Sequence, residues 1–329
     1  MKLTCEQIKD ITRGALDVFE DSCGVHFRRF APAQAEYLLS VSNFTKKVFN
    51  TAGVKFDFYT DSEYLALEFS FGIRSTSKQV AIDTYVDGAL VHNEDYIPVE
   101  GERASYKACF DKKGRKRVSV YLPHTTELVL TSFSLSDAAT VEPYTAYAKK
   151  VLVCGDSITQ GHHSEYTSLS YANRLASFFG WDILNQAIAG YWFDGKWVDG
   201  KIDFAPELIT VAYGTNDWSA ENTVENFEAN LRGFFDALTS AFPKVPIAVL
   251  LPIWRYDEKK DNFCTFDEHR ARIVSIAGEY KLTYVVDSYR FVPHLPEFFA
   301  DDGVHPNSLG HAEYARGVAA ALMKYGLEK

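Results

Sequence analysis

Ser157, His305 and Asp302 are the residues of this sequence whose types and spacing best suit nucleophilic catalysis. Ser157 ends the tripeptide Gly155-Asp156-Ser157, directly after the β-branched and aliphatic run 151–154, which is typical of a buried strand. A serine at the carboxyl end of a parallel strand lies in the crevice where α/β sheets place their chemistry. The same tripeptide also suits an ordinary strand-to-helix turn with a capping serine. Ser157 is therefore a nucleophile only if a base lies beside it.

His305 is the candidate base, and Asp302 is its candidate partner. Both belong to the segment Asp302-Gly303-Val304-His305-Pro306. Gly303 allows a tight turn that brings the carboxylate onto Nδ1–H of the imidazole, and the following proline restricts the backbone of His305. A carboxylate at Nδ1 holds the tautomer that leaves Nε2 free to take a proton from Ser157. Each residue also has a simpler interpretation: Asp302 is also typical of a helix cap, and His305 is also typical of an exposed surface histidine.

Three groups are candidates to stabilise a developing oxyanion. Asn216, in Gly214-Thr215-Asn216-Asp217, follows the apolar run 208–213, and its amide can donate as a backbone N–H does. Gly190 follows the run 181–184 and lets a backbone N–H approach with no side chain in the way. The third donor is the N–H of Ser157. Turns and helix caps also use these residue types. However, each candidate residue follows a different strand of the same predicted sheet, which favours a functional site.

The second half of the chain alternates strand-like and helix-like segments after Pro143. One helical segment carries apolar side chains with the spacing of a single buried face, namely Phe227, Leu231, Phe234, Phe235 and Leu238. Alternating strands and helices predict a parallel sheet covered by helices on both faces. The five expected strands are 151–154, 181–184, 208–213, 247–251 and 284–286.

The first half has a period of two from about residue 16 to residue 135. Val54, Phe56 and Phe58 alternate with Lys55 and Asp57, which predicts a strand with one face in solvent. Turn signals recur at short intervals, as in all-β sandwiches and jelly rolls. We therefore expect an all-β jelly-roll or sandwich domain over 1–145, with a short helix near 5–13, and an α/β catalytic domain over 146–329.

Charge and composition narrow the classes of partner. A formal net charge of −10 argues against nucleic acid or an anionic membrane as the main partner. The longest apolar run, 245–254, holds two prolines and is too short to span a bilayer. The five cysteines lack the spacing of a disulfide framework or a zinc site. With no apolar leader visible at the start of the sequence, we expect a cytoplasmic protein with reduced thiols and no metal.

These blocks carry a family resemblance. Gly155-Asp156-Ser157, Gly190, Gly214-Thr215-Asn216-Asp217 and Asp302-Gly303-Val304-His305-Pro306 resemble the four motifs of the SGNH, or GDSL, hydrolase superfamily over about 150–329. The resemblance implies a flavodoxin-like three-layer α/β/α domain and a serine esterase mechanism without metal or cofactor. It implies Ser157 as nucleophile, His305 as base with Asp302, and Ser157, Gly190 and Asn216 as the oxyanion hole. The G-x-S-x-G motif of conventional α/β-hydrolases is absent.

A jelly-roll module ahead of such a domain is similar to carbohydrate esterase family 2. The segment Ile82-Asp83-Thr84-Tyr85-Val86-Asp87-Gly88 resembles a hairpin of that module. The similarity implies removal of small acyl groups, above all acetyl, from an oligosaccharide or a small carbohydrate ester. Trp192, Trp218 and Trp254 each follow a strand end, and we expect them to rim the crevice and stack on a sugar. Ordinary packing in loops is the alternative for these three indoles.

Two other functions suit the same sequence. A lipase, lysophospholipase or thioesterase would use the same catalytic residues with a longer acyl chain. A carbohydrate-binding protein would use the β-domain alone, with a degenerate hydrolase half. The complete set of candidate catalytic residues argues against the carbohydrate-binding protein. A series of esters with different acyl lengths distinguishes a lipase or thioesterase from an acetyl esterase.

Overall fold

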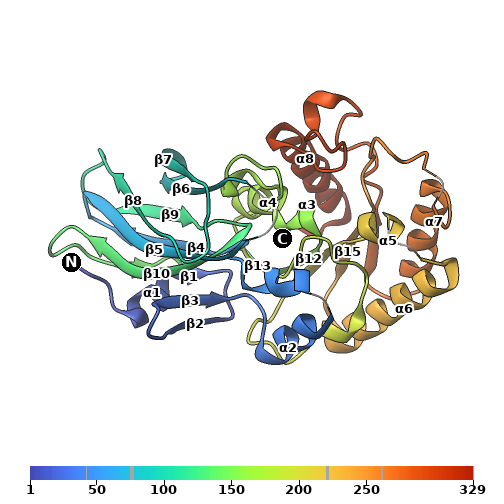
Figure 1. The fold of residues 1–329 in the computed structure, drawn as a ribbon, viewed down its shortest axis with the longest axis horizontal. Coiled ribbons are helices and arrows are strands. Elements are labelled where there is room, and N and C mark those ends of the chain that lie inside the picture. The colour runs from blue at the N-terminus through green and yellow to red at the C-terminus, as the bar shows by residue number, and fades with distance from the viewer. Residues whose placement is uncertain (42, 75–77, 220–221, 261, 329) are drawn as a thin grey trace.

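The computed structural model of the protein describes residues 1–41, 43–74, 78–219, 222–260 and 262–328. Within these residues the strands form two antiparallel sheets, which belong to the first half of the chain, and one parallel sheet, which belongs to the second (Figure 1). Among the described helices, none is both long and apolar enough to cross a membrane.

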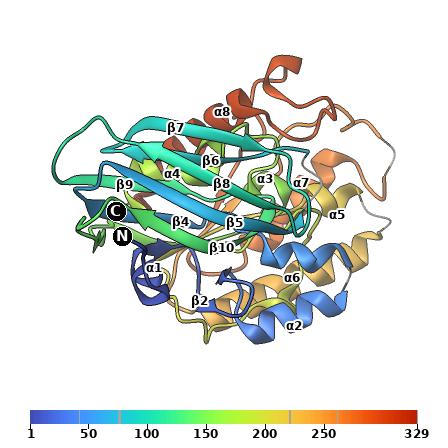
Figure 2. The same cartoon turned by 60° about the vertical axis from the view of Figure 1, so that its left-hand side comes forward.

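The two antiparallel sheets pack face to face as a sandwich around one apolar core (Figures 1 and 2). One sheet has the order β1-β4-β9-β6-β7, with β11 also paired to β4, and the other has the order β2-β3-β10-β5-β8. The strands are β1 Thr12–Arg13, β2 Asp17–Glu20, β3 Val25–Arg28, β4 Lys55–Thr60, β5 Tyr64–Arg74, β6 Val80–Val86, β7 Ala89–Tyr96, β8 Arg103–Cys109, β9 Lys116–Tyr121, β10 Thr126–Leu135 and β11 Glu142–Pro143.

The third sheet is parallel throughout and has the order β13-β12-β14-β15-β16. In chain order this is 2-1-3-4-5, the flavodoxin-like arrangement, in which ligands bind beyond the carboxyl ends of the strands. Its strands are β12 Lys149–Gly155, β13 Trp181–Asn185, β14 Leu208–Ala212, β15 Ile247–Leu250 and β16 Thr283–Val286.

Helices cover both faces of the parallel sheet because its side chains alternate between two apolar clusters. Leu152 and Cys154 face the cluster that contains α6 and α7, whereas Val151 and Val153 face the cluster that contains α4 and α8. The α-helices of this half are α3 Ser157–Gln160, α4 Tyr171–Phe179, α5 Thr215–Ser219, α6 Val224–Ala241, α7 Phe266–Ala277 and α8 Ser308–Tyr325, and its 3-10 helices are η2 Thr167–Leu169, η3 Gly195–Trp197 and η4 Pro296–Phe298.

The expected fold class is confirmed, and so is the apolar stripe of α6, whose five predicted residues are all buried. The short helix near the start is α1, Cys5–Ile11. The sequence pattern missed two helices inside the β-rich half, α2 Pro32–Val41 and η1 Asn43–Phe49. Their side chains Leu38 and Val48 pack into the core of the parallel sheet rather than into the sandwich. The division into domains 1–145 and 146–329 stays a prediction.

The expectation that β4 has a solvent face is wrong. Lys55 and Asp57 are both buried, although they alternate with the apolar residues of the strand as predicted. Arg117 of β9 and Lys55 both form ion pairs with Asp57, and the three charges share the outer face of this sheet. The alternation along β4 was thus predicted correctly. The face that was expected to lie in solvent is instead occupied by an ion-pair network.

Candidate active site

The turn after β12 places Ser157 at the first position of the short helix α3. Asp156 caps this helix, because its carboxylate accepts a hydrogen bond from the N–H of Ile158 at 3.0 Å. Gly155 is required for close packing, since a Cβ there would lie 2.2 Å from the Thr159 hydroxyl. Ser157 is 6% exposed and follows β12 at the carboxyl edge of the sheet.

Ser157, His305 and Asp302 form one chain of hydrogen bonds. The Ser157 Oγ lies 2.6 Å from His305 Nε2, and His305 Nδ1 lies 2.6 Å from Asp302 Oδ2. The other carboxylate oxygen of Asp302 accepts the backbone N–H groups of Val304, at 2.9 Å, and His305, at 3.0 Å. This geometry leaves Nε2 in position to receive the serine proton while Asp302 fixes the ring.

The local turn explains how two residues only three apart can pair. Gly303 adopts φ +66°, a left-handed conformation that favours glycine. The ring of Tyr256 lies directly over it, and a Cβ at this position would lie 2.8 Å from that ring. Partial burial of Asp302 opposes ionisation, but the hydrogen bonds from His305 and from the two backbone N–H groups outweigh it and lower the pKa of the carboxyl below its ordinary 3.8. Asp302 is therefore an anion at neutral pH.

The candidate oxyanion donors lie on the loops after β13 and β14. Asn216, at the start of α5, donates one amide N–H to the carbonyl of Tyr191 at 2.9 Å, which leaves its second N–H available. Gly190 adopts φ +85° in the other loop. Among the described residues, the backbone N–H groups of Ser157 and Gly190 find no hydrogen-bond acceptor. Preorganised donors without a protein acceptor suit an anion that forms only during reaction.

Two histidines that follow the Ser157 turn lie against the imidazole ring of His305. The ring centroids of His162 and His163 lie 5.9 Å and 5.2 Å from that of His305. His163 Nε2 lies 3.7 Å from Asp302 Oδ2, and its backbone has the unusual φ of +62°. Burial lowers the pKa of His162 well below 6.5, so this ring stays neutral beside His305.

One group of side chains in the described residues offers metal-ligand atoms close together. Single donor atoms of His163, Asp302 and His305 lie within 4.8 Å of one another. His305 Nδ1 already donates its proton to Asp302, so a cation bound here would displace the hydrogen bond that orients the base. These atoms are thus better suited to the triad than to a resident metal.

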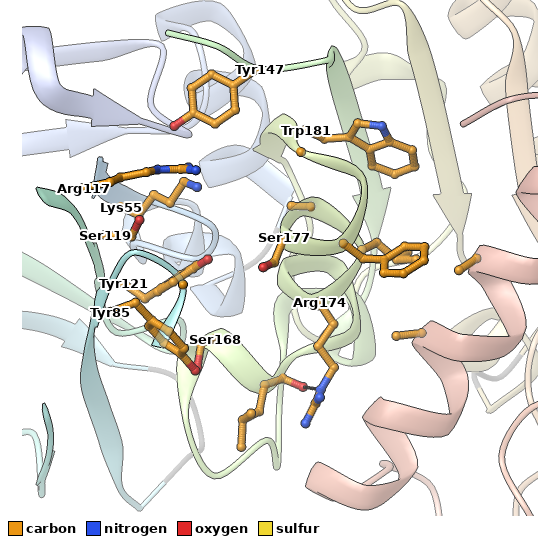
Figure 3. Close-up of a pocket in the computed structure, with 18 of the residues that line it drawn as sticks. Lys55, Tyr85, Arg117, Ser119, Tyr121, Tyr147, Ser168, Arg174, Ser177 and Trp181 are labelled. Carbon is orange, nitrogen blue, oxygen red and sulfur yellow. Dashed lines mark hydrogen bonds between the residues drawn. The ribbon is translucent and has the colours of Figure 1, made fainter. Parts of the chain in front are cut away.

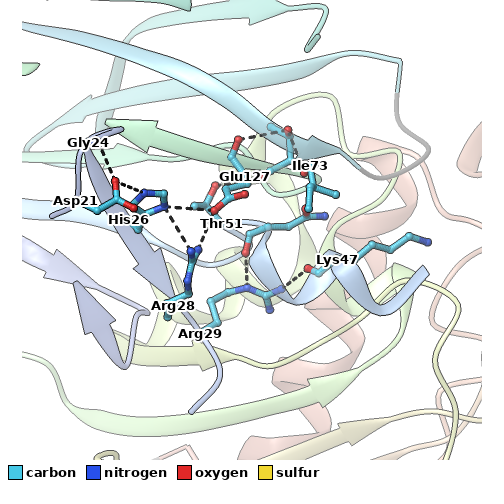
Figure 4. Close-up of polar contacts among 11 residues, drawn as sticks. Asp21, Gly24, His26, Arg28, Arg29, Lys47, Thr51, Ile73 and Glu127 are labelled. Atoms are coloured by element: carbon cyan, nitrogen blue, oxygen red, sulfur yellow. Dashed lines mark hydrogen bonds and ion pairs between the residues drawn. The ribbon is translucent and has the colours of Figure 1, made fainter. Parts of the chain in front are cut away.

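A buried arginine from the β-rich half holds the Gly190 loop. Arg29 is fully buried, and its guanidinium donates only to backbone carbonyls, those of Lys47 and Asn50 before β4 and those of Asn185 and Ala187 after β13. Lys47 reaches the same loop and donates to the carbonyl of Ala189 at 3.2 Å. Figure 4 shows Arg29 and Lys47 beside the ion pair of Arg28 and Glu127. The sandwich therefore helps to shape the oxyanion loop.

Sequence reasoning missed Arg29, because a single arginine after a strand gives no signal of its long-range acceptors. Burial without a carboxylate partner lowers its pKa to about 9, which still leaves it charged at neutral pH. A charge buried in this way is tolerated only because several carbonyls satisfy its donors. The loop and the cation thus depend on each other.

The three predicted tryptophans have different surroundings. Trp254 is half-buried and stacks on His294 at 4.6 Å, next to Tyr256 and the Asp302 turn, and Trp192 is half-buried and stacks on Tyr191 at 4.8 Å. Trp218 is 0% exposed, and its indole N–H donates to the carbonyl of Cys264. A fully buried indole offers no face to a sugar, so the prediction for Trp218 is wrong, whereas Trp192 and Trp254 stay predictions.

Asp217, next to Asn216, links the two oxyanion loops. It is buried, accepts the N–H of Phe193 at 3.1 Å through one oxygen, and within the described chain its other oxygen has no hydrogen-bond partner. Burial raises the pKa of Asp217 to about 7, against the opposing effect of this backbone N–H. The folded protein therefore holds the protonated carboxyl below neutral pH, and both forms are populated near neutral pH.

We predict that Arg29→Gln lowers the free energy of unfolding by about 2 kcal/mol or more, because it leaves buried carbonyls unpaired. The control is Arg232→Gln, which removes an exposed arginine paired with Glu279 and should leave the unfolding midpoint nearly unchanged. Urea denaturation followed by fluorescence measures both. Equal stability of the two variants would contradict the structural role of Arg29.

We predict that the stability of the Asp217→Asn variant increases relative to that of the parent as pH rises. The carboxyl ionises at its ordinary 3.8 in the unfolded chain and at about 7 in the folded chain. Between these values the unfolded state loses the proton first, so the parent loses stability across this window and no further above it. Melting curves from about pH 5 to about pH 8 measure the difference in midpoint. The exposed Asp111→Asn is the control, and a pH-independent difference for Asp217→Asn would contradict the prediction.

Comparisons with known proteins agree with this geometry. Residues 153–313 match the GDSL-like Lipase/Acylhydrolase family. An acetylxylan esterase of Xylanibacter ruminicola is 25% identical over 213 residues, which cover 53% of this chain. The match spans only 43% of that relative, less than half of its length.

Two solved structures share the fold of nearly the whole chain. A salicylyl-acyltransferase from a tetracycline biosynthetic pathway has a TM-score of 0.85 at 20% identity, covering 96% of this chain and 94% of its own. A family two carbohydrate esterase from Clostridium thermocellum, solved in complex with cellohexaose, has a TM-score of 0.70 at 14% identity, covering 96% and 99%. At these identities the likeness concerns the fold.

Proposed function

We propose that this protein is a serine esterase that removes small acyl groups, above all acetyl, from carbohydrate esters, because residues 153–313 match the GDSL-like Lipase/Acylhydrolase family. The observation that carries the proposal is the continuous chain of hydrogen bonds from Ser157 through His305 to Asp302. Beside that chain lie donors whose N–H groups are available to an oxyanion.

In the proposed first step the Ser157 Oγ attacks the ester carbonyl carbon while His305 Nε2 takes the hydroxyl proton. The carbonyl oxygen becomes an oxyanion, which accepts hydrogen bonds from the N–H groups of Ser157 and Gly190 and from the free N–H of Asn216. The Asp302 carboxylate stabilises the imidazolium that forms. The intermediate then collapses, the acyl–oxygen bond breaks, and His305 returns the proton to the departing sugar hydroxyl.

In the second step a water molecule takes the place of the sugar hydroxyl. His305 accepts a proton from this water as it attacks the acyl-enzyme, and the same donors hold the second oxyanion. Collapse releases the carboxylic acid and restores the Ser157 hydroxyl. No step requires a group beyond these side chains and water.

The acetyl and carbohydrate parts of the proposal have separate support. A relative at 25% identity is named an acetylxylan esterase, and a structure with the same fold was solved with cellohexaose. The half-buried Trp254 and the exposed Tyr256 border the Asp302 turn, where stacking against a sugar ring would place its ester near Ser157. All five cysteines are free thiols, which supports our proposal that the protein works in a reducing compartment such as the cytoplasm.

We predict that the protein hydrolyses p-nitrophenyl acetate and a peracetylated sugar, and that Ser157→Ala falls to background on both. Asn216→Ala should lower kcat by about 10²- to 10³-fold because it removes one oxyanion donor. Asn230→Ala, an identical change on the exposed face of α6, is the control and should retain parental kcat.

Three results would contradict this proposal. A preference for octanoyl over acetyl esters would favour a lipase or a thioesterase. A parent that is silent on all esters would favour a carbohydrate-binding protein. An Asn216→Ala variant with kcat within a few-fold of the parent would remove Asn216 from the oxyanion hole.

A further inference from the structure

A second hollow, separate from the catalytic triad, lies between the sandwich and the α/β half. It has a volume of about 990 Å³ and is lined on one side by residues of β4, β6 and β9 and on the other by residues of α4 and α8 (Figure 3). Neither the catalytic triad nor Gly190 and Asn216 contribute to its lining. Its volume is at the upper end of the range typical of ligand sites.

The sandwich side of this cleft is an ion-pair network around one buried carboxylate. Asp57 receives two hydrogen bonds from Arg117, at 2.8 and 2.7 Å, and lies 2.9 Å from Lys55 Nζ. The hydroxyl groups of Tyr147 and Ser119 also donate to it. One anion thus neutralises only one of two cations, and the sandwich side keeps an excess positive charge.

The charge state of this network is well defined at neutral pH. Burial alone would raise the pKa of Asp57, but the hydrogen bonds and charges of Arg117 and Lys55 outweigh it and lower the pKa to about 2. Burial and the charge of Arg117 oppose the charged form of Lys55, but Tyr121 and Asp57 outweigh them and raise the pKa of Lys55. The carboxylate and both cations therefore stay charged, and the excess is one positive charge.

The opposite wall adds a further cation and exposed surface from α4. Arg174 donates through Nε to the carbonyl of Leu169 at 2.8 Å, which leaves the far end of its guanidinium for other acceptors. Ser177 is exposed beside it, and the ring of Phe178 is 67% exposed. In Figure 3, Ser177 points across the cleft toward Tyr121.

The sandwich side of the lining is rich in hydroxyl groups and aromatic rings, whereas the opposite wall also carries leucine, alanine and methionine side chains of α4 and α8. Tyr121 is a buried ring that contacts the ring of Tyr85 edge-on, with 5.7 Å between the ring centroids. Tyr85 donates to the hydroxyl of Ser168 at 3.0 Å, which brings the two walls together. Rings with polar edges suit the faces and hydroxyl groups of sugars better than they suit a lipid chain.

The balance of charge points to an anionic ligand. Lys55, Arg117, Arg174 and Arg316 line the cleft, against the single lining carboxylate of Asp87, which itself pairs with Lys112. Arg316 pairs with Glu313, and Asp57 offsets one of the two cations Lys55 and Arg117. The excess positive charge is therefore one on the sandwich side and that of Arg174 on α4. In a chain with a net charge of −10, such a concentration of cations in a hollow attracts anions selectively.

We propose that this cleft is a second binding site, which takes an oligosaccharide that carries carboxylate groups, such as a short chain of uronic acids. One of its carboxylates binds the free end of the Arg174 guanidinium, a second is attracted by the excess positive charge of Lys55 and Arg117, and its rings lie against Tyr121 and Phe178. Bidentate pairing with carboxylates is the geometry that arginine provides and lysine does not. The site goes beyond the proposed esterase reaction and does not depend on it.

The test is isothermal titration calorimetry on the full chain carrying Ser157→Ala, with trigalacturonic acid as the acidic probe and cellotriose as the neutral probe. We expect one molecule of trigalacturonic acid per chain, with a Kd that rises about tenfold or more in about 0.5 M NaCl, because the salt screens the contacts. Cellotriose should bind this site at least about tenfold more weakly.

Two pairs of variants locate the binding. Ser177→Trp fills the cleft from an exposed helix position and should raise the Kd for trigalacturonic acid about tenfold or more, whereas Ser177→Ala should not change it. Arg174→Gln should weaken binding. The control is Arg272→Gln, which changes an arginine of α7 that pairs with Glu228 of α6, away from the cleft, and it should leave the Kd unchanged. Circular dichroism confirms that each variant is folded.

The proposal is overturned if the folded protein does not bind trigalacturonic acid, if cellotriose binds equally well at the cleft, or if Ser177→Trp and Arg174→Gln leave the Kd unchanged. Binding is measured without turnover, so its outcome is independent of the esterase. A parent that binds the acidic probe but hydrolyses no ester would remove the proposed function and keep this site.

Discussion

The buried guanidinium of Arg29 is the constraint on which the arrangement of the two halves depends. It carries a charge into a core without a carboxylate, and it is satisfied only because carbonyls from before β4 and from after β13 converge on it. Two of these carbonyls, those of Asn185 and Ala187, belong to the segment that leads to Gly190. The sandwich is thus part of the frame that fixes the backbone around the candidate oxyanion hole, and α2 and η1 add apolar contacts in the same region.

The site itself is assembled from loops that leave one edge of the parallel sheet. Ser157 follows β12, Gly190 follows β13 and Asn216 follows β14, while Asp302 and His305 come from the segment between β16 and α8. Their distances are set by local turns, in which Gly303 and Gly190 adopt conformations that other residues rarely reach. Charge then completes the arrangement, because Asp302 stays ionised and His162 stays neutral around the ring of His305, which we propose as the base.

The parts of the structure that were predictable from the sequence are those encoded by short-range patterns. The alternation of strands and helices, the buried stripe of α6 and the turn that joins Asp302 to His305 depend on neighbouring residues. The rest depends on partners far away in the chain. Lys55 and Asp57 alternate as a solvent face does, but Arg117 and Tyr147 cover them; Trp218 follows a strand end, but its indole is buried against Cys264; Arg29 has acceptors more than a hundred residues away.

The central claim is that Ser157 is the nucleophile and that His305 activates it. The most direct measurement is covalent labelling with diethyl p-nitrophenyl phosphate, followed by digestion and mass spectrometry. We expect one diethylphosphoryl group, carried by Ser157, whose formation parallels the loss of esterase activity and slows strongly in His305→Ala. An adduct on another residue that accompanies inactivation, or a labelling rate of Ser157 unchanged in His305→Ala, would contradict the mechanism.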